Sequence, residues 1–316
     1  FTYYMLFYIL MQIIPLDINS PETLNFALHE SKHDSISGVV QISHGMAEHM
    51  GRYEHFISFL NEAGFHVIIH NHRGHGDRLI DGKIGFFASK NGWSLVVDDL
   101  ISIHNWAVKQ YSELPHILLG HSMGSWIAMS ALQKAADYDL VLISGSSKPQ
   151  FFESFIQKLL VRFETMRLGS SGYSNFLHNT IFGGFNAKFK DAETSNDWLS
   201  RDKSSVDDYT KDPLCGFVVT NQLWLDVIDG ISEIFLLNNL SLISQETPML
   251  IFSGSEDPVG GMGKGTTELH NCFIQNGCKS QLLLIQGARH ETLNETDKMD
   301  TYKHVINFIK NNLTGH

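Results

Sequence analysis

One serine stands in a pattern that would make it a nucleophile. Ser122 is the centre of the pentapeptide Gly-His-Ser-Met-Gly at residues 120–124. The apolar run 117–119 before it and the apolar periodicity of 125–132 after it predict a strand, a sharp turn and a helix. Side chains at the two glycine positions would collide with the neighbouring helix and strand, and the strained turn lifts the serine hydroxyl clear of the sheet. This arrangement predicts covalent catalysis of acyl transfer by Ser122.

A serine hydroxyl becomes a good nucleophile only when a base removes its proton, and that base is typically a histidine held by a carboxylate. Asp257 lies in the turn after one predicted strand, and His290 lies in the loop after the next. The chain order serine, acid, histidine is the one found with a nucleophile on a strand-turn-helix motif. We therefore predict a catalytic triad of Ser122, Asp257 and His290, with Glu256 as the alternative acid.

Acyl transfer also requires hydrogen-bond donors for the negative charge that develops on the carbonyl oxygen. The backbone N–H of Met123 adjoins the nucleophile and is the first candidate donor. The loop His44-Gly45-Met46 follows an early predicted strand, and the Met46 N–H is the second candidate. Gly45 lets this backbone approach a substrate closely. This chemistry needs neither a metal ion nor a cofactor.

The elements that must position these residues alternate between strands and helices. The predicted strands cover residues 38–43, 65–70, 117–119, 140–144, 248–252 and 282–285, and the predicted helices cover 52–63, 94–111 and 301–313. Such alternation is typical of an α/β fold with a mainly parallel, doubly wound sheet. Each candidate site residue follows a strand, at the carboxyl edge where such sheets bind ligands.

The alternation breaks between residues 146 and 245, where apolar helical segments and glycine pairs replace the strands. We predict a core of residues 1–145 and 246–316 and a helical cap of residues 146–245. Helices that merely fill a face of the sheet are the alternative. Four apolar residues of this insertion are candidates to line an acyl pocket, with packing inside the insertion as the alternative: Phe152, Phe163, Phe217 and Leu225.

Composition excludes several function classes. The chain has 316 residues and a net charge of −11, which argues against nucleic-acid binding. Among 17 histidines, His70, His72 and His75 lie close together, but without the spacing of a metal site. Three cysteines, too few for a disulfide framework, predict a reducing, cytoplasmic compartment.

The first 14 residues are strongly apolar. They lack the basic region and small-residue cleavage site of a secretory signal, and they are too short to span a bilayer. We predict a lead-in strand here. A membrane-surface anchor, which would make the protein peripheral to a membrane, and residues foreign to the natural reading frame are the alternatives.

Four motifs together resemble one enzyme family. They are His-Gly-Met-Ala-Glu-His at 44–49, His-Arg-Gly-His-Gly at 72–76, Gly-His-Ser-Met-Gly at 120–124 and Ser-Glu-Asp-Pro-Val-Gly at 255–260. The chain is similar, from about residue 39 to its end, to the serine-aminopeptidase-like branch of the α/β-hydrolases. That branch contains monoacylglycerol lipases and bacterial lysophospholipases, and the segments 198–202 and 212–216 also resemble bacterial members.

The resemblance implies an α/β-hydrolase fold with a helical cap and hydrolysis of carboxylic esters of single-acyl-chain lipids through an acyl-enzyme. It implies the nucleophile, acid and base roles of the triad and the oxyanion roles of Met46 and Met123. A further set of residues matches the loop that supports the site: His44, Gly45, Glu48, His49 and Arg52. The implied partner is a small lipid ester, with transient contact with a membrane surface; the oligomeric state is left open.

Two other activities fit the same triad, and one function without catalysis remains an alternative. An aminopeptidase-type enzyme and a general carboxylesterase are the rival activities, and a catalytically dead ligand-binding hydrolase is the third alternative.

The sequence also departs from the family pattern. Asn71 and Arg78 replace an aspartate and a small hydroxyl residue, which concerns loop packing, and the first 37 residues do not align with the usual β-hairpin start.

Overall fold

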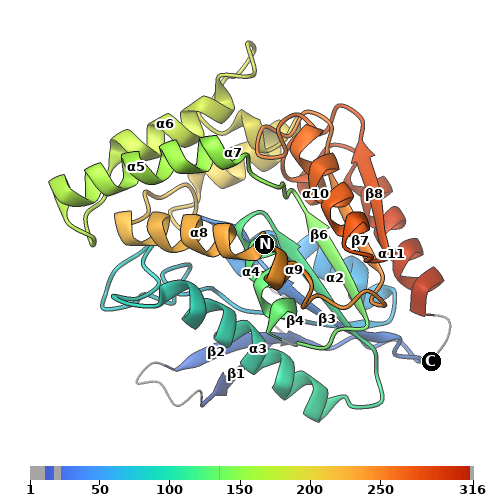
Figure 1. The fold of residues 1–316 in the computed structure, drawn as a ribbon. Helices are drawn as coiled ribbons and strands as arrows, with labels where there is room; N and C mark the ends of the chain where they lie inside the picture. Colours follow the sequence, from blue (N-terminus) through green and yellow to red (C-terminus); the bar gives the residue numbers. More distant parts are fainter. Residues whose placement is uncertain (1–10, 18–22, 135, 314–316) are drawn as a thin grey trace.

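The computed structural model describes residues 11–17, 23–134 and 136–313, without the side chains of 151–154 (Figure 1). Within these residues, eight strands form one sheet in the order β1-β2-β4-β3-β5-β6-β7-β8. The strands are β1 (Met11–Leu16), β2 (Leu24–His29), β3 (Gly38–Ser43), β4 (Phe65–Ile69), β5 (His116–His121), β6 (Leu140–Ser144), β7 (Met249–Gly254) and β8 (Ser280–Ile285). Strands β3 to β8 are parallel to one another, which confirms the mainly parallel sheet.

Helices lie between the strands and after the last one. The α-helices are α2 (Glu54–Glu62), α3 (Gly92–Gln110), α4 (Met123–Gln133), α5 (Phe151–Leu168), α6 (Asn175–Asn186), α7 (Lys203–Lys211), α8 (Asn221–Ile234), α9 (Leu237–Leu240), α10 (Lys264–Gln275) and α11 (Lys298–Leu313). Three short 3₁₀ turns are η1 (Met50–Tyr53), η2 (Asp197–Leu199) and η3 (Thr292–Asn294).

The sheet is covered by helices on both faces, as predicted. Successive side chains of a strand point to opposite faces. On β5, Ile117 and Leu119 pack in the same apolar cluster as α2 and α11, whereas Leu118 packs in the cluster formed with α3, α4, α8 and α10. Burial on both faces explains why these strands read as continuous apolar runs rather than as alternating patterns.

The N-terminal end of the sheet differs from the sequence expectation. β1 and β2 form an antiparallel pair, and β2 pairs antiparallel with β4, so the chain does begin its sheet with a hairpin. The side chains of β1 are half-buried or exposed, so their sequence pattern is weak. The strand is held to β2 by backbone hydrogen bonds, which do not depend on side-chain type. The predicted lead-in strand is therefore described from Met11 onward, and residues 1–10 lie outside the described residues.

One helix begins later than its periodicity predicts. The predicted helix 52–63 is the 3₁₀ turn η1 followed by α2. The imidazole of His49 caps η1, because its Nδ1 accepts a hydrogen bond from the Gly51 N–H at 3.2 Å. This cap holds His49 and the preceding Glu48 at the carboxyl edge of β3.

Helices α5 to α9 connect β6 to β7 and fall within the predicted insertion 146–245. In Figure 1, α5 and α6 lie at the top of the molecule, and α8 runs below α5. Side chains of α8 join the same apolar cluster as α3 and α4, which anchors the insertion on the sheet layer. In the part of the chain that the structure describes, no helix has the length and apolar character to span a bilayer.

Candidate active site

Ser122 lies at the junction of β5 and α4 in a backbone conformation that is rare for a non-glycine residue. Its φ is 51° and its ψ is −123°. A Cβ on Gly124 would lie 2.1 Å from the Ser43 carbonyl oxygen, and one on Gly120 would lie 2.6 Å from the Gly124 carbonyl oxygen. The close approach of β3, β5 and α4 therefore requires both glycines. The strained turn is held by the packing around it and presents Ser122 to a cavity.

Asp257 and His290 come together at the carboxyl edge of β7 and β8. The Asp257 Oδ1 and the His290 Nδ1 are 3.0 Å apart, and both side chains are almost fully buried. The other carboxylate oxygen accepts a hydrogen bond from Ser253 Oγ at 2.7 Å. Glu256, the alternative acid, is exposed, so the structure places Asp257 rather than Glu256 on the imidazole.

The same pairing shifts the pKa values of both groups. Burial alone lowers the pKa of His290, but the charge and hydrogen bond of Asp257 outweigh burial and raise it above 6.5. Burial alone raises the pKa of Asp257, and His290 with Ser253 outweighs it and lowers the pKa. The Asp257 carboxylate thus stays charged and holds the proton on Nδ1 of His290, so Nε2 is the unprotonated nitrogen of the neutral ring.

The two candidate oxyanion donors line the same cavity as Ser122 and His290. Met123 is the first residue of α4, and Met46 lies in the loop after β3. Among the described residues, neither backbone N–H donates to a protein acceptor. Gly45 keeps the loop close, since a Cβ there would lie 3.2 Å from the Ser122 Cβ.

Buried polar contacts hold the loop 44–49 in place. Glu48 accepts hydrogen bonds from the Gly45 N–H and, at 2.9 Å, from the Tyr53 hydroxyl. Burial, with a smaller contribution from Glu291, raises the pKa of Glu48 to about 7. His44 Nδ1 donates to the Gly45 carbonyl at 2.8 Å, and its Nε2 accepts from the His72 N–H at 3.0 Å. These contacts hold the loop that carries Met46, which lines the cavity.

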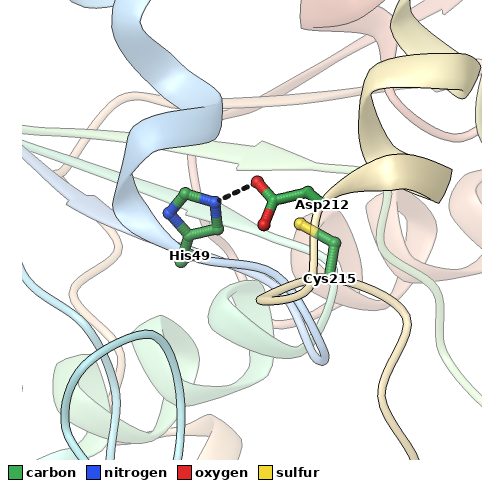
Figure 2. Close-up of side chains that lie close together, drawn as sticks. All are labelled: His49, Asp212 and Cys215. Atoms are coloured by element: carbon green, nitrogen blue, oxygen red, sulfur yellow. Dashed lines mark hydrogen bonds and ion pairs between the residues drawn. The ribbon is translucent and has the colours of Figure 1, made fainter.

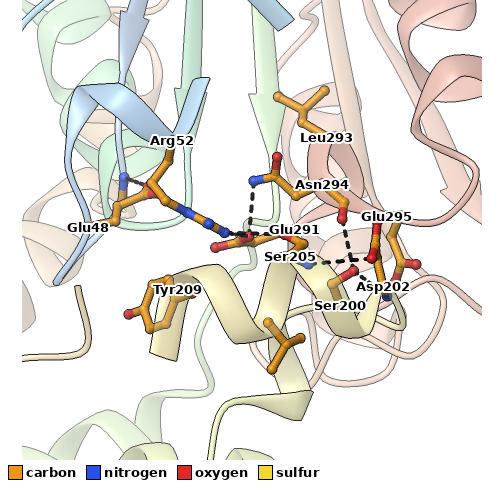
Figure 3. A network of polar contacts seen from close by, with 12 residues as sticks. Glu48, Arg52, Ser200, Asp202, Ser205, Tyr209, Glu291, Leu293, Asn294 and Glu295 are labelled. Carbon is orange, nitrogen blue, oxygen red and sulfur yellow. Dashed lines mark hydrogen bonds and ion pairs between the residues drawn. The ribbon is translucent and has the colours of Figure 1, made fainter. Parts of the chain in front are cut away.

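Arg52 lies at the centre of a network that sequence reasoning captured only in part (Figure 3). Its guanidinium contacts Glu291 Oε2 at 2.6 Å, and Asn294 donates to the same carboxylate oxygen at 3.0 Å. Glu291 was not predicted, although its position directly after His290 could have pointed to it. Trp198 was also missed as a site residue; its ring lies 5.1 Å from the His290 ring.

The family profile described as serine aminopeptidase, S33, matches residues 34–297. The chain belongs to the S33 family.

Relatives place this S33 hydrolase in the monoacylglycerol lipase-like branch of the α/β-hydrolases. It is 26% identical over 254 residues to the monoglyceride lipase of Rattus norvegicus, covering 78% of this chain and 74% of that protein. A thermostable carboxyl esterase from Bacillus coagulans in complex with glycerol has a similar structure, with a TM-score of 0.87, 25% identity, and coverage of 96% and 99%. A lipase in an open form gives a TM-score of 0.85 and 26% identity, with coverage of 96% and 99%.

The S33 hydrolase has a cavity of about 420 Å³ that is lined by Ser122, by His290 and by many residues of the insertion. The apolar and aromatic side chains that line it from α6, η2 and α8 are Ile181, Phe182, Phe185, Trp198, Leu199, Trp224, Val227, Ile228 and Ile231. The α8 residues among them recur every three or four positions and share one face of that helix.

The pocket residues expected from sequence are different. Phe163 is 57% exposed and lies away from the cavity. Phe217 and Leu225 pack against the apolar core. Leu225 directly follows Trp224 on α8, and it therefore points to another side of the helix than the cavity-lining Trp224. The Phe152 side chain lies outside the described residues. Apolar character alone did not indicate which helix face would meet Ser122.

The departures from the family pattern are accommodated in the loop after β4. Asn71 donates to Asp77 Oδ1 at 2.7 Å and accepts from the Met50 N–H at 2.9 Å. Arg78 contacts Asp99 Oδ2 at 2.9 Å, and Asp99 also pairs with Arg73. Both residues therefore contribute to loop packing and lie outside the predicted triad.

Three of the histidines are buried in the same region. His70, His72 and His75 are enclosed, and burial lowers the pKa of each. The rings of His72 and His75 lie 4.3 Å and 5.4 Å from that of His44. These neutral rings thus pack behind the loop that carries Met46.

Breaking the buried Arg52–Glu291 pair should destabilise the S33 hydrolase. Arg52→Met leaves the Glu291 carboxylate buried without its cation, and the expected loss is about 3–5 kcal/mol of unfolding free energy. Urea denaturation measures this loss. Lys203→Met, which removes an ion pair between exposed side chains, is the matched control and should leave the unfolding midpoint unchanged. Equal midpoints for the two variants would contradict a structural role for Arg52.

Proposed function

We propose that this protein is a serine carboxylic-ester hydrolase that acts on lipids with a single acyl chain, of the monoacylglycerol lipase or lysophospholipase type. The observation that carries the proposal is the buried Asp257–His290 pair beside Ser122 in an apolar cavity. Membership of the S33 family and similarity to a monoglyceride lipase support the ester and lipid parts of it.

In this mechanism Ser122 Oγ attacks the ester carbonyl while His290 Nε2 accepts its proton. The negative charge on the carbonyl oxygen accepts hydrogen bonds from the Met46 and Met123 N–H groups. His290 then donates the proton to the leaving alcohol, and an acyl-enzyme remains on Ser122. A water molecule, deprotonated by His290, attacks the acyl-enzyme and releases the fatty acid. Asp257 stabilises the imidazolium in both halves.

The shape of the cavity favours one acyl chain bound beneath the insertion. We propose that residues 146–245 act as a cap, with 1–145 and 246–316 as the core. A volume of about 420 Å³ is in the usual range for a small-molecule site, and its roof is largely apolar and aromatic. A single flexible chain fits this apolar roof. Glu48, Glu268 and Glu291 line the cavity from the core side, so a substrate panel, and not the lining, separates a lipid ester from a substrate with a free amino terminus.

A substrate panel tests this function. We expect kcat/KM on 1-monoacylglycerols or lysophospholipids with a long acyl chain to exceed that on the corresponding short-chain esters by at least about tenfold, since binding of the chain contributes to transition-state stabilisation. Aminoacyl-p-nitroanilides should be turned over far more slowly. Amide turnover equal to ester turnover would favour the aminopeptidase alternative, and a preference for the short esters would favour a general carboxylesterase.

The outer surface of the insertion supports transient contact with a lipid surface. Large apolar side chains of α5 and α6 are more than a third exposed: Phe155, Ile156, Leu159, Phe163, Met166 and Phe176. Exposed apolar patches of this kind mark interaction sites more often than isolated residues do. We propose a cytoplasmic protein with peripheral contact at this surface, which suits its free cysteines, and co-sedimentation with phosphatidylcholine vesicles can test the contact.

A further inference from the structure

Three side chains with different donor atoms meet where the core touches the insertion (Figure 2). His49 comes from the loop after β3, and Asp212 and Cys215 come from the turn after α7. Their ligand atoms, one from each residue, all lie within 4.8 Å of one another. We propose that His49, Asp212 and Cys215 form a binding site for a borderline-soft divalent cation of the Zn²⁺ class.

The local backbone directs the three side chains to one point. Asp212 accepts from the Leu214 N–H at 2.8 Å, and the Cys215 N–H donates to the Asp212 carbonyl at 3.0 Å, so a tight turn brings the carboxylate and thiol together. The Nδ1 of His49 is occupied by the Gly51 N–H. Its Nε2 therefore points to Asp212 Oδ2, 2.8 Å away. Because Nδ1 accepts this hydrogen bond, Nε2 carries the ring proton and donates to Asp212. Coordination by Nε2 would move the ring proton to Nδ1 and break the 3.2 Å hydrogen bond from the Gly51 N–H.

The donor set selects the type of ion. Imidazole nitrogen, carboxylate oxygen and thiolate sulfur suit Zn²⁺ or Co²⁺, whereas Mg²⁺ and Ca²⁺ prefer oxygen alone. In a tetrahedral site with bonds of about 2.0–2.3 Å, ligand atoms lie roughly 3.3–3.6 Å apart. The nitrogen and oxygen, now 2.8 Å apart, must separate slightly, and the sulfur, which lies within 4.8 Å of both, must come to this spacing. Side-chain rotation supplies shifts of this size.

Partial exposure provides an entry route and a fourth ligand. The side chains of His49 and Asp212 are 17% and 28% exposed, and Cys215 is buried beside them. A water molecule can complete the coordination from the solvent side. The positive charge of nearby Arg52 is balanced by Glu291, and Asp212 adds a negative charge at the site itself. The surroundings therefore do not repel a cation.

An ion here would tie the candidate oxyanion loop to the insertion. Helix α7 and the segment after it already contact this loop, because the Tyr209 hydroxyl and the Gly216 N–H both donate to the Ala47 carbonyl, at 2.9 Å and 2.8 Å. Ala47 adjoins Met46. The metal would add a third link between the two segments and restrict movement of the insertion relative to the loop. The site is independent of the proposed substrate.

Titration of the untagged full-length protein with Co²⁺ tests the site. A bound thiolate gives a near-ultraviolet charge-transfer absorption, which the other histidine-containing surfaces cannot produce. We expect this band to saturate at one equivalent and to be bleached by Zn²⁺. Cys215→Ser should abolish it, and His49→Gln and Asp212→Asn should each weaken Co²⁺ binding by about tenfold or more.

Cys272→Ser is the matched control, because it removes a different buried free thiol and should leave the band unchanged. Circular dichroism verifies that each variant folds. If Cys215→Ser does not fold, Asp212→Asn, which retains all three thiols, decides the question through the same band. Absence of the band in the folded wild type would overturn the proposal. Its persistence in Cys215→Ser, or unchanged affinity in Asp212→Asn, would do the same.

Discussion

Replacing Ser122 by alanine is expected to lower kcat on monoacylglycerol by about 10⁴- to 10⁶-fold and to abolish labelling by a fluorophosphonate. The variant lacks the oxygen that forms the acyl-enzyme, whereas the cavity and the Met46 and Met123 N–H groups remain. The expected residual rate reflects binding and the oxyanion donors alone. Initial rates on monoacylglycerol and gel fluorescence with a tagged fluorophosphonate measure the two effects.

Ser130→Ala is a matched control for this result. Ser130 lies on α4, the helix that follows Ser122, and its hydroxyl accepts from Trp93 Nε1 at 3.0 Å. This variant should keep both labelling and turnover. Labelling that persists in Ser122→Ala would exclude Ser122 as the nucleophile. Failure of the wild type to label at all would favour the alternative of a ligand-binding protein without catalysis.

Asp257→Asn should produce the second large loss, about 10⁴-fold in kcat, because an amide can hold the imidazole in the wrong tautomer. It should also change the pH dependence. His290 acts as a base only when neutral, and Asp257 raises its pKa in the wild type, so activity falls as the pH drops through that raised value. Without the carboxylate the pKa of His290 decreases, and the residual activity should persist to lower pH.

The profile of kcat/KM against pH measures this shift, because it reports ionisation in the free enzyme. Glu256→Gln is the control, since it removes the adjacent exposed carboxylate and should leave rate and profile unchanged. A full rate loss in Glu256→Gln with an active Asp257→Asn would reverse the assignment of the acid. An acid limb that stays in place in Asp257→Asn would show that another group limits the rate at low pH.

Strands β5 and β1 differ in how strongly their sequences indicate a strand. β5 is buried on both faces, so its apolar run and the following glycines identify a strand and turn without any knowledge of neighbours. β1 carries a weaker pattern, because several of its side chains are exposed and its pairing with β2 rests on backbone groups. Periodicity reports burial, so it indicated a lead-in strand but neither the bounds of β1 nor its pairing with β2.

The pocket shows a second kind of limit. The sequence identified an apolar insertion but not its inner face, since Phe163 and Phe182 are equivalent as residue types. Phe163 is exposed on α5, whereas Phe182 faces the cavity from α6. The difference arises from how α5, α6 and α8 pack on one another, which involves contacts between residues far apart in the chain.

The sequence by itself determined the residues that local backbone geometry requires. The glycines around Ser122, the order of Ser122, Asp257 and His290, and the predicted strand before each follow from short segments. Only the tertiary structure decided which side chains meet. It selected Asp257 over Glu256, joined Arg52 to Glu291, and brought His49 to Asp212 and Cys215. These pairs are separated by 33, 239 and 163 or more positions, and no local pattern encodes such contacts because packing of the whole sheet creates them.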